Sequence, residues 1–100
     1  MNREKFLPIG SVVLLKETPK RVMINGFLVK SKDNEGKIYD YVGCLYPEGI
    51  IDSKKNIVFN HSEIDLIYYL GYQDSEWEKA KITLRAAEQR NAKIIDSNVN

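Results

Sequence analysis

The segment Lys37–Gly49 (KIYDYVGCLYPEG) constrains the fold of this chain most strongly. Side chains alternate between the two faces of a strand, and here both faces carry apolar groups. A strand with two apolar faces has to be covered on both sides. We expect the protein's own core to cover one side, and a helix, a folded-over sheet or another protein to cover the other. One face presents Ile38, Val42, Cys44 and Tyr46, and the other presents Tyr39, Tyr41 and Leu45.

Short apolar runs separated by polar turns predict about five strands between residues 11 and 72. In the second run, Asn25-Gly26 is a hairpin signal, but the arms on either side are very short. We therefore favour one long strand bent by a bulge over two separate strands. Gly43 indicates close packing or a second bend. The predicted strands cover residues 11–17, 20–32, 37–46, 57–59 and 66–72, with a cap and a single helical turn at 60–63.

The C-terminal third changes to helical spacing. Trp77, Ala80, Leu84 and Ala87 recur every three or four residues, which predicts a helix over about 75–90. Asp74 or Ser75 can start this helix, and Ser75 with Glu78 forms a capping-box pattern. We expect Trp77 to anchor the helix on the sheet and residues 91–100 to form a loose tail.

These elements predict an α+β fold. Sequential strands joined by short turns favour an antiparallel sheet, and a five-stranded sheet in a small domain tends to curl. We expect a strongly bent antiparallel sheet or a partly open small barrel, SH3-like in outline, followed by one C-terminal helix. A chain of 100 residues has room for a single domain, which we place at residues 1–90.

Composition is that of an ordinary globular protein, with 43% hydrophobic and 29% charged residues. The net charge of +1 does not favour nucleic-acid binding, which usually needs a strongly basic face. We find no apolar stretch of membrane-spanning length, no secretory pattern and only one cysteine. We therefore expect a cytoplasmic protein without a membrane partner.

The sequence predicts no catalytic, metal-binding or cofactor-binding residues, and we expect a protein that is not an enzyme. A nucleophilic pair would have to join Cys44 to the single histidine, His61, and no oxyanion-binding pattern accompanies them. One histidine and one cysteine are also too few for a zinc site. We interpret Cys44 as a small core residue and His61 as a turn residue. The acidic residues around the central strand (Asp40, Glu48 and Asp52) are interpreted as solvated turn residues.

Six tyrosines concentrate on two predicted strands. They suit cross-strand packing, a binding interface or, less well, a platform for base stacking. Tyr68 and Tyr69 are adjacent, so on a regular strand they face opposite ways and one of them can be exposed. The predicted partner surface consists of Tyr39, Tyr41, Tyr46, Pro47, and Tyr68 or Tyr69.

Four blocks of the sequence resemble a known family: residues 7–15 (LPIGSVVLL), 39–49 (YDYVGCLYPEG), 59–61 (FNH) with Ile64, and 70–73 (LGYQ). It is a domain-of-unknown-function family of small Gram-positive proteins often encoded beside LXG-type toxins of type VII secretion, and it resembles the EsaE-like toxin chaperones. The resemblance implies a cytosolic accessory protein or chaperone that binds a secreted toxin or its targeting region. It implies no catalytic residues.

Two other functions remain open from the sequence. A small barrel that binds nucleic acid would need one coherent basic face next to exposed aromatic rings. A self-associating structural module, such as a homodimer, would pair its sheet edge or its tyrosine face with a second copy. The residues available for a basic face are Lys16, Lys20, Arg21, Lys30, Lys32 and Lys37.

Overall fold

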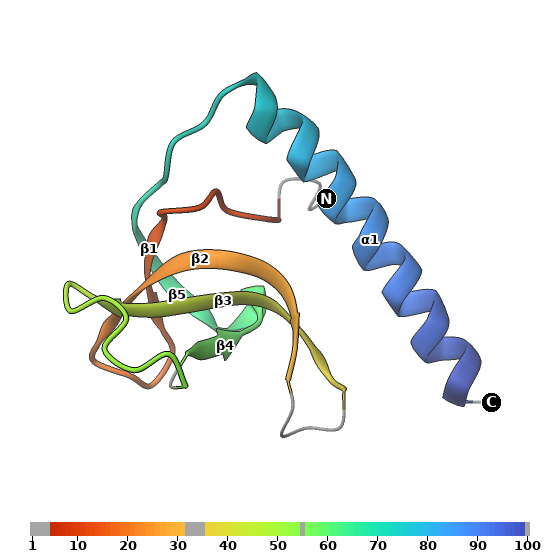
Figure 1. Cartoon of the computed structure of the whole chain (residues 1–100), viewed down its shortest axis with the longest axis horizontal. Helices are drawn as coiled ribbons and strands as arrows, with labels where there is room; N and C mark the ends of the chain where they lie inside the picture. The colour runs from red at the N-terminus through yellow and green to blue at the C-terminus, as the bar shows by residue number, and fades with distance from the viewer. Residues whose placement is uncertain (1–4, 32–35, 55, 100) are drawn as a thin grey trace.

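The computed structural model of the chain describes residues 5–31, 36–54 and 56–99, with side chains up to residue 90. Five strands form one antiparallel sheet in the order β4-β3-β2-β1-β5, and one helix follows it (Figure 1). β4 and β5 lie at opposite edges, so the sheet is not closed, and the predicted α+β fold class is confirmed. The elements are β1 (Val12–Leu15), β2 (Arg21–Lys30), β3 (Ile38–Tyr46), β4 (Ile57–Phe59), the short 3-10 helix η1 (His61–Glu63), β5 (Ile64–Tyr69) and α1 (Ser75–Val99).

The long strand β2 runs through Asn25-Gly26 without a break, so the bent strand predicted from the sequence is confirmed. Its pairing with β3 shifts between Ile24 and Gly26, which is a β-bulge. A Cβ atom at Gly26 would lie 2.6 Å from Cγ1 of Val42, so a larger residue would force the two strands apart. Bulges bend and twist a strand, and β2 arches accordingly in Figure 1.

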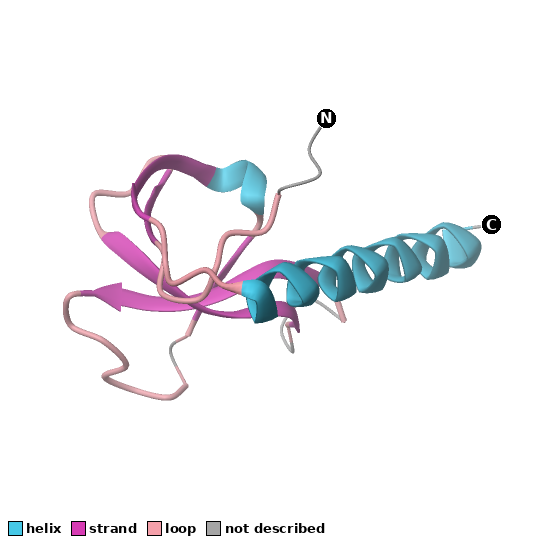
Figure 2. Ribbon diagram, turned by 90° about the horizontal axis from the view of Figure 1, so that it is seen from above, coloured by secondary structure: helices cyan, strands magenta, loops and turns pink. Residues whose placement is uncertain are grey.

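The core lies on one face of the sheet, which we call the inner face. The N-terminal segment and α1 cover it, and Figure 2 shows α1 along one side of the sheet and extending beyond it. Trp77 stacks on Phe27 with ring centroids 5.7 Å apart, which confirms that Trp77 anchors the helix. The buried core consists of Phe6, Leu7, Val13, Leu15, Val22, Ile24, Tyr41, Phe59 and Trp77.

Two local predictions around β3 and β4 are confirmed. A Cβ atom at Gly43 would lie 2.5 Å from the carbonyl oxygen of Met23, so this glycine allows close packing of β3 against β2. After β4, Asn60 precedes the single turn of η1, and its backbone N–H donates a 2.9 Å hydrogen bond to the Glu63 carboxylate. That bond is one half of a capping box.

The start of α1 at Ser75 is confirmed, but its capping box and its end differ from the prediction. Asp74 is the capping residue, because its Oδ1 accepts a 2.9 Å hydrogen bond from the Trp77 N–H. Ser75 is already helical, so the predicted capping box between Ser75 and Glu78 is wrong. The helix continues to Val99, which also corrects the predicted end near residue 90 and the loose tail. No glycine or proline follows Gly71 to stop it.

The strands β1 and β5 also have different bounds from those predicted. β1 ends at Leu15 because Glu17 adopts a positive φ of 63° in the following turn. β5 begins at Ile64 and ends at Tyr69, earlier in the chain than predicted. The chain then leaves the sheet, and the N–H of Gly71 donates a 3.0 Å hydrogen bond to Oγ of the buried Ser11. This contact ties the start of the helix connection to the segment before β1.

Candidate functional site

The face of the sheet opposite the core, which we call the outer face, carries two rows of side chains. Residues directly opposite each other in antiparallel strands project from the same face. The register pairs Val12 with both Tyr69 and Met23. Met23 in turn pairs with Cys44. The first row is therefore apolar and crosses β5, β1, β2 and β3.

The second row contains a single charge in its centre. Leu14 pairs with Leu66 on β5 and with Arg21 on β2, and Arg21 pairs with Tyr46 on β3. The guanidinium carbon of Arg21 lies 5.1 Å from the ring centroid of Tyr46 and 5.7 Å from that of Tyr68. These distances are typical of cation–π contacts, so two tyrosine rings from different strands hold the arginine side chain in place.

The two rows border a groove of about 560 Å³, which we call the outer groove. Its walls include Tyr68 and Tyr69, whose side chains are 54% and 64% exposed. Exposed aromatic rings beside an apolar floor are typical of surfaces that bind other molecules. The outer groove is lined by Gly10, Val12, Arg21, Met23, Tyr46, Tyr68 and Tyr69.

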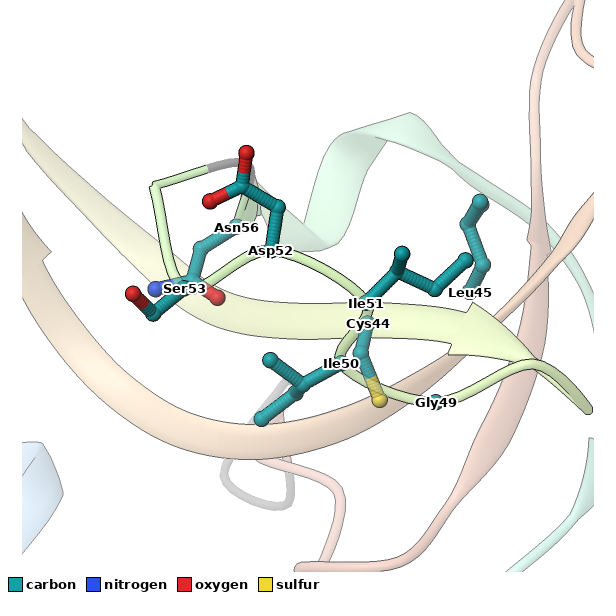
Figure 3. Close-up of a pocket in the computed structure, with 8 residues that line it drawn as sticks. All are labelled: Cys44, Leu45, Gly49, Ile50, Ile51, Asp52, Ser53 and Asn56. Atoms are coloured by element: carbon teal, nitrogen blue, oxygen red, sulfur yellow. The ribbon is translucent and has the colours of Figure 1, made fainter.

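The hollow surface continues beyond the outer groove. Met23 and Tyr46 also line a cavity of about 210 Å³ that includes Pro47. Cys44 links this cavity to a larger one, of about 660 Å³, formed with the loop after β3. Figure 3 shows Cys44 pointing toward the turn at Gly49 and Ile50 in that larger cavity. Three adjoining hollows thus extend from β5 to the loop before β4, and the last of them is lined in part by polar residues of that loop.

Of the residues predicted to bind a partner, four lie on this surface: Tyr46, Pro47, Tyr68 and Tyr69. Tyr41 is 0% exposed, so its predicted place on the partner surface is wrong. The reason is the alternation of β3, which turns Tyr41 to the inner face when Cys44 and Tyr46 face outward.

Tyr39 does not line the outer groove. It pairs with Val29 near the far end of β3, and the Lys37 amine lies 5.1 Å from its ring centroid. Its side chain is half-buried. A role for Tyr39 in binding a partner stays a prediction.

Tyr68 and Tyr69 both line the outer groove, so the prediction that they face opposite ways is wrong. Val12 pairs with Tyr69, but the next residue, Val13, pairs with Ile67. This register shift leaves an additional residue on β5 and interrupts its alternation. The irregularity brings both rings to one side.

Sequence reasoning missed several residues of this surface. In the sequence, Arg21 is one of many basic residues, and Val12 and Met23 are ordinary residues of apolar runs. A signal was present, because the run 11–15 (SVVLL) carries apolar groups on both faces, as the central strand does. Two such strands side by side indicate a sheet with two apolar faces. Ile50 and Ile51, which are 60% and 76% exposed, gave no such signal because they lie in a loop.

The inner face contains a polar cluster around the Tyr41 hydroxyl. The hydroxyl oxygen accepts a 3.1 Å hydrogen bond from the backbone N–H of Leu7. It lies 3.0 Å from the carbonyl oxygen of Lys5 and 2.8 Å from Nδ1 of His61. The hydroxyl has one proton and can donate it to either of these two acceptors. Burial raises the pKa of Tyr41, so this group stays neutral at physiological pH.

Charged groups surround this cluster. The Lys5 amine forms ion pairs with Glu88 on α1 and, at 3.1 Å, with Asp40. Burial opposes the charge of Lys5, but its hydrogen bonds with Glu88 and Asp40 outweigh burial and raise its pKa. The Asp40 carboxylate also accepts a 2.8 Å hydrogen bond from the backbone N–H of His61. Its carboxylate is largely buried, so the prediction of a solvated residue is wrong for Asp40, whereas Glu48 and Asp52 are exposed as predicted.

His61 predicts a pH-dependent stability. Burial of the ring and the positive charge of Lys5 lower the pKa of His61. The unfolded chain therefore binds a proton at His61 more readily than the folded chain does. Neutral His61 stabilises the fold at pH values above the unfolded pKa of 6.5, and this stabilisation is lost as the pH falls toward the lower pKa of the folded state. We expect the free energy of unfolding, measured by urea titration, to fall between about pH 7.5 and pH 5.5. His61→Asn retains an acceptor and should weaken this dependence; an unchanged dependence would contradict the role of His61.

Cys44 and His61 do not form a pair. Cys44 is buried on the outer face, whereas His61 contacts Tyr41, which projects from the inner face. Within residues 5–31, 36–54 and 56–99, no group of three or more His, Cys, Asp or Glu residues could hold a metal ion. No helix in the described part of the chain is long and apolar enough to cross a membrane.

The basic residues that could form a nucleic-acid-binding face are not all close together. Arg21 and Lys30 are the first and last residues of β2, so they lie at opposite ends of the arch. Lys20 is already paired with Glu48 at 2.6 Å. Lys32 lies outside the described residues. Among the residues that the structure describes, this arrangement is not the continuous basic surface that nucleic-acid binding favours.

Comparison with known proteins gives one match. Residues 6–80 match the family model of a domain of unknown function, DUF4176, and this range includes all five strands and the beginning of α1. No curated protein and no solved structure matches the chain. The matched range contains every residue that lines the outer groove. The chain therefore belongs to the DUF4176 family, whose domain has no known function.

Proposed function

We propose that the protein is a non-catalytic accessory protein that binds a type VII secreted LXG-type toxin, or its targeting region, in the cytoplasm. The toxin as partner rests on the resemblance of residues 39–49 and the neighbouring blocks to proteins encoded beside such toxins. In this role the protein would cover apolar surface of the toxin before its secretion, as a chaperone or adaptor does.

One observation supports a binding function most directly: the sheet has apolar side chains on both faces, and α1 covers only the inner one. The outer groove leaves Tyr68 and Tyr69 more than half exposed. Burying such rings in a complex contributes binding energy, and tyrosine is common among residues that dominate protein interfaces. We assign the outer groove as the binding surface.

The edge of the sheet offers a second contact. In the described part of the sheet, β5 pairs only with β1, so its other side has backbone groups available for another strand. Leu66 and Ile67 on this strand, and Leu70 just after it, are each about half exposed. An amphipathic helix of the partner would use the outer groove, and an extended segment would add to β5.

The test is co-purification of the full chain with a toxin encoded beside it, followed by titration calorimetry. The double variant Tyr46→Ala/Tyr69→Ala should weaken binding at least about tenfold, or ~1.4 kcal/mol, because it removes two rings from the groove. If the double variant folds poorly, the affinity of the single variant Tyr69→Ala is measured in its place. Tyr72→Ala is the matched control, because this ring is 80% exposed but does not line the outer groove.

The outcomes separate the proposals. Full-strength binding by a folded double variant would exclude the outer groove as the binding surface. Lack of binding to the wild-type chain would overturn the toxin as partner. Dimers in light scattering at two concentrations, lost in the double variant, would favour the self-associating module instead. Retention on DNA or RNA that falls steeply with added salt would favour a nucleic-acid binder.

A further inference from the structure

Arg21 occupies an unusual position for a surface charge. It lies between Leu14 and Tyr46 in the second row of the outer face, and both neighbours in that row are apolar or aromatic. Tyr46 and Tyr68 contact it from β3 and β5, which fixes the position of its guanidinium group. A planar guanidinium held by rings still has N–H donors at its edges.

These donors have no carboxylate partner within the described chain. The ion pairs of the described residues involve Lys5, Lys20 and Lys81, but not Arg21. Glu48 forms its ion pair with Lys20, at 2.6 Å. That hydrogen bond and, to a smaller extent, the positive charge of Arg21 lower the pKa of Glu48. Within the described residues, the charge of Arg21 is offset only by the Coulombic attraction of Glu48 and by the rings of Tyr46 and Tyr68, and the N–H edges of its guanidinium face solvent.

A docked partner would remove that solvent. The other residues that line the outer groove are uncharged, so Arg21 would become the only charge beneath the contact. A buried charge without a counter-charge loses its hydration without compensation and would oppose docking. A carboxylate in the occupant removes this cost, and it matches the fork geometry of a guanidinium with two parallel hydrogen bonds.

We propose that Arg21 is the specificity-determining residue of the outer groove, and that the occupant is a peptide segment with an Asp or Glu side chain flanked by apolar residues. The apolar residues seat on Val12, Met23 and Tyr69, and the carboxylate bonds the guanidinium between Tyr46 and Tyr68. This inference rests on the proposed binding function, because it names the chemistry of the segment that enters the same groove.

The test is selection from a random peptide phage library on the full-length wild-type chain. Selected peptides should be enriched in one Asp or Glu with apolar neighbours. The same selection on Arg21→Gln should keep the apolar residues and lose the acidic one. Lys20→Gln is the matched control, because it removes a positive charge one residue away and should leave the acidic preference intact.

A selected peptide and its Glu→Gln or Asp→Asn counterpart are then titrated by fluorescence polarisation. Arg21→Gln should weaken binding of the acidic peptide at least tenfold and change the affinity for the neutral counterpart by no more than about twofold. Arg21→Lys should recover only part of the loss, because a lysine amine lacks the planar fork. Thermal unfolding of each variant checks that the fold is intact.

The results distinguish two failures. In the first case, the wild type selects apolar peptides with no acidic preference, and the Tyr46→Ala/Tyr69→Ala variant does not bind them. This result would overturn the role of Arg21 but keep the outer groove as a binding surface. Acidic peptides that bind Arg21→Gln as tightly as the wild type would also overturn it. In the second case, no selected peptide loses binding in the Tyr46→Ala/Tyr69→Ala variant. This result would overturn both the specificity assigned to Arg21 and the outer groove as a binding surface.

Discussion

Replacement of Tyr41 by alanine is expected to lower the free energy of unfolding by about 4 kcal/mol or more. The side chain is 0% exposed, and its ring lies within 6 Å of the rings of Phe6 and Phe59. Truncation leaves a cavity at the centre of the core and also removes the acceptor for the buried N–H of Leu7. The total free energy of unfolding of a domain of this size is roughly 5–15 kcal/mol, so the variant should be close to unfolding.

Urea titration followed by the fluorescence of Trp77, the single tryptophan, measures this loss. Tyr41→Phe keeps the ring contacts and removes only the hydroxyl, so we expect a loss of about 1–2 kcal/mol. Tyr39→Ala on the same strand is the surface control, because that ring is only half-buried. Equal losses for Tyr41→Ala and Tyr39→Ala would contradict the central position of Tyr41.

Gly71→Ala is expected to cost about 3 kcal/mol, which is large for the addition of one methyl group. A Cβ atom at this position would overlap the carbonyl oxygen of Ile9 and lie 2.8 Å from its carbonyl carbon. These are backbone atoms and cannot rotate away. The same shift would break the hydrogen bond from the Gly71 N–H to Ser11 Oγ, whose hydroxyl donates a 2.7 Å bond to the Pro8 carbonyl.

Gly49→Ala is the matched control for Gly71→Ala. Gly49 has a φ of +81° and open space where a Cβ atom would be added. Alanine there meets only conformational strain of about 1–2 kcal/mol. The prediction fails if Gly71→Ala lowers the free energy of unfolding no more than Gly49→Ala does. Residues 9–11 would then be able to shift away from residue 71, and the close packing inferred between them would be wrong.

Much of the fold was predictable because the relevant signals are local. Apolar and β-branched runs bounded by polar turns located all five strands, and β4 agreed at both ends. Asn25-Gly26 identified the bulge, since arms of a few residues cannot form separate strands. The spacing of Trp77, Ala80 and Leu84 identified the helix. The polar composition after residue 90 predicts an earlier end, but no helix-breaking residue follows to stop the helix there.

The candidate site was less predictable because it depends on contacts between distant segments. Alternation along β3 separated Tyr41 from Tyr46, but it did not indicate which of the two faces α1 covers. The irregular pairing of β5 has no local signature, so Tyr68 and Tyr69 were placed on opposite faces. The contacts of Arg21 come from Tyr46 on β3 and Tyr68 on β5, which lie far from it in the chain.

The strands that form the outer groove also form the core, and consecutive residues serve the two purposes. In β2, Arg21 and Met23 project outward, whereas Val22 and Ile24 are buried. Substitutions at the outward positions therefore leave the packing beneath them almost unchanged. The same scaffold could be retargeted by a combinatorial library restricted to these positions, and related chains could diverge in what they recognise while their architecture is preserved.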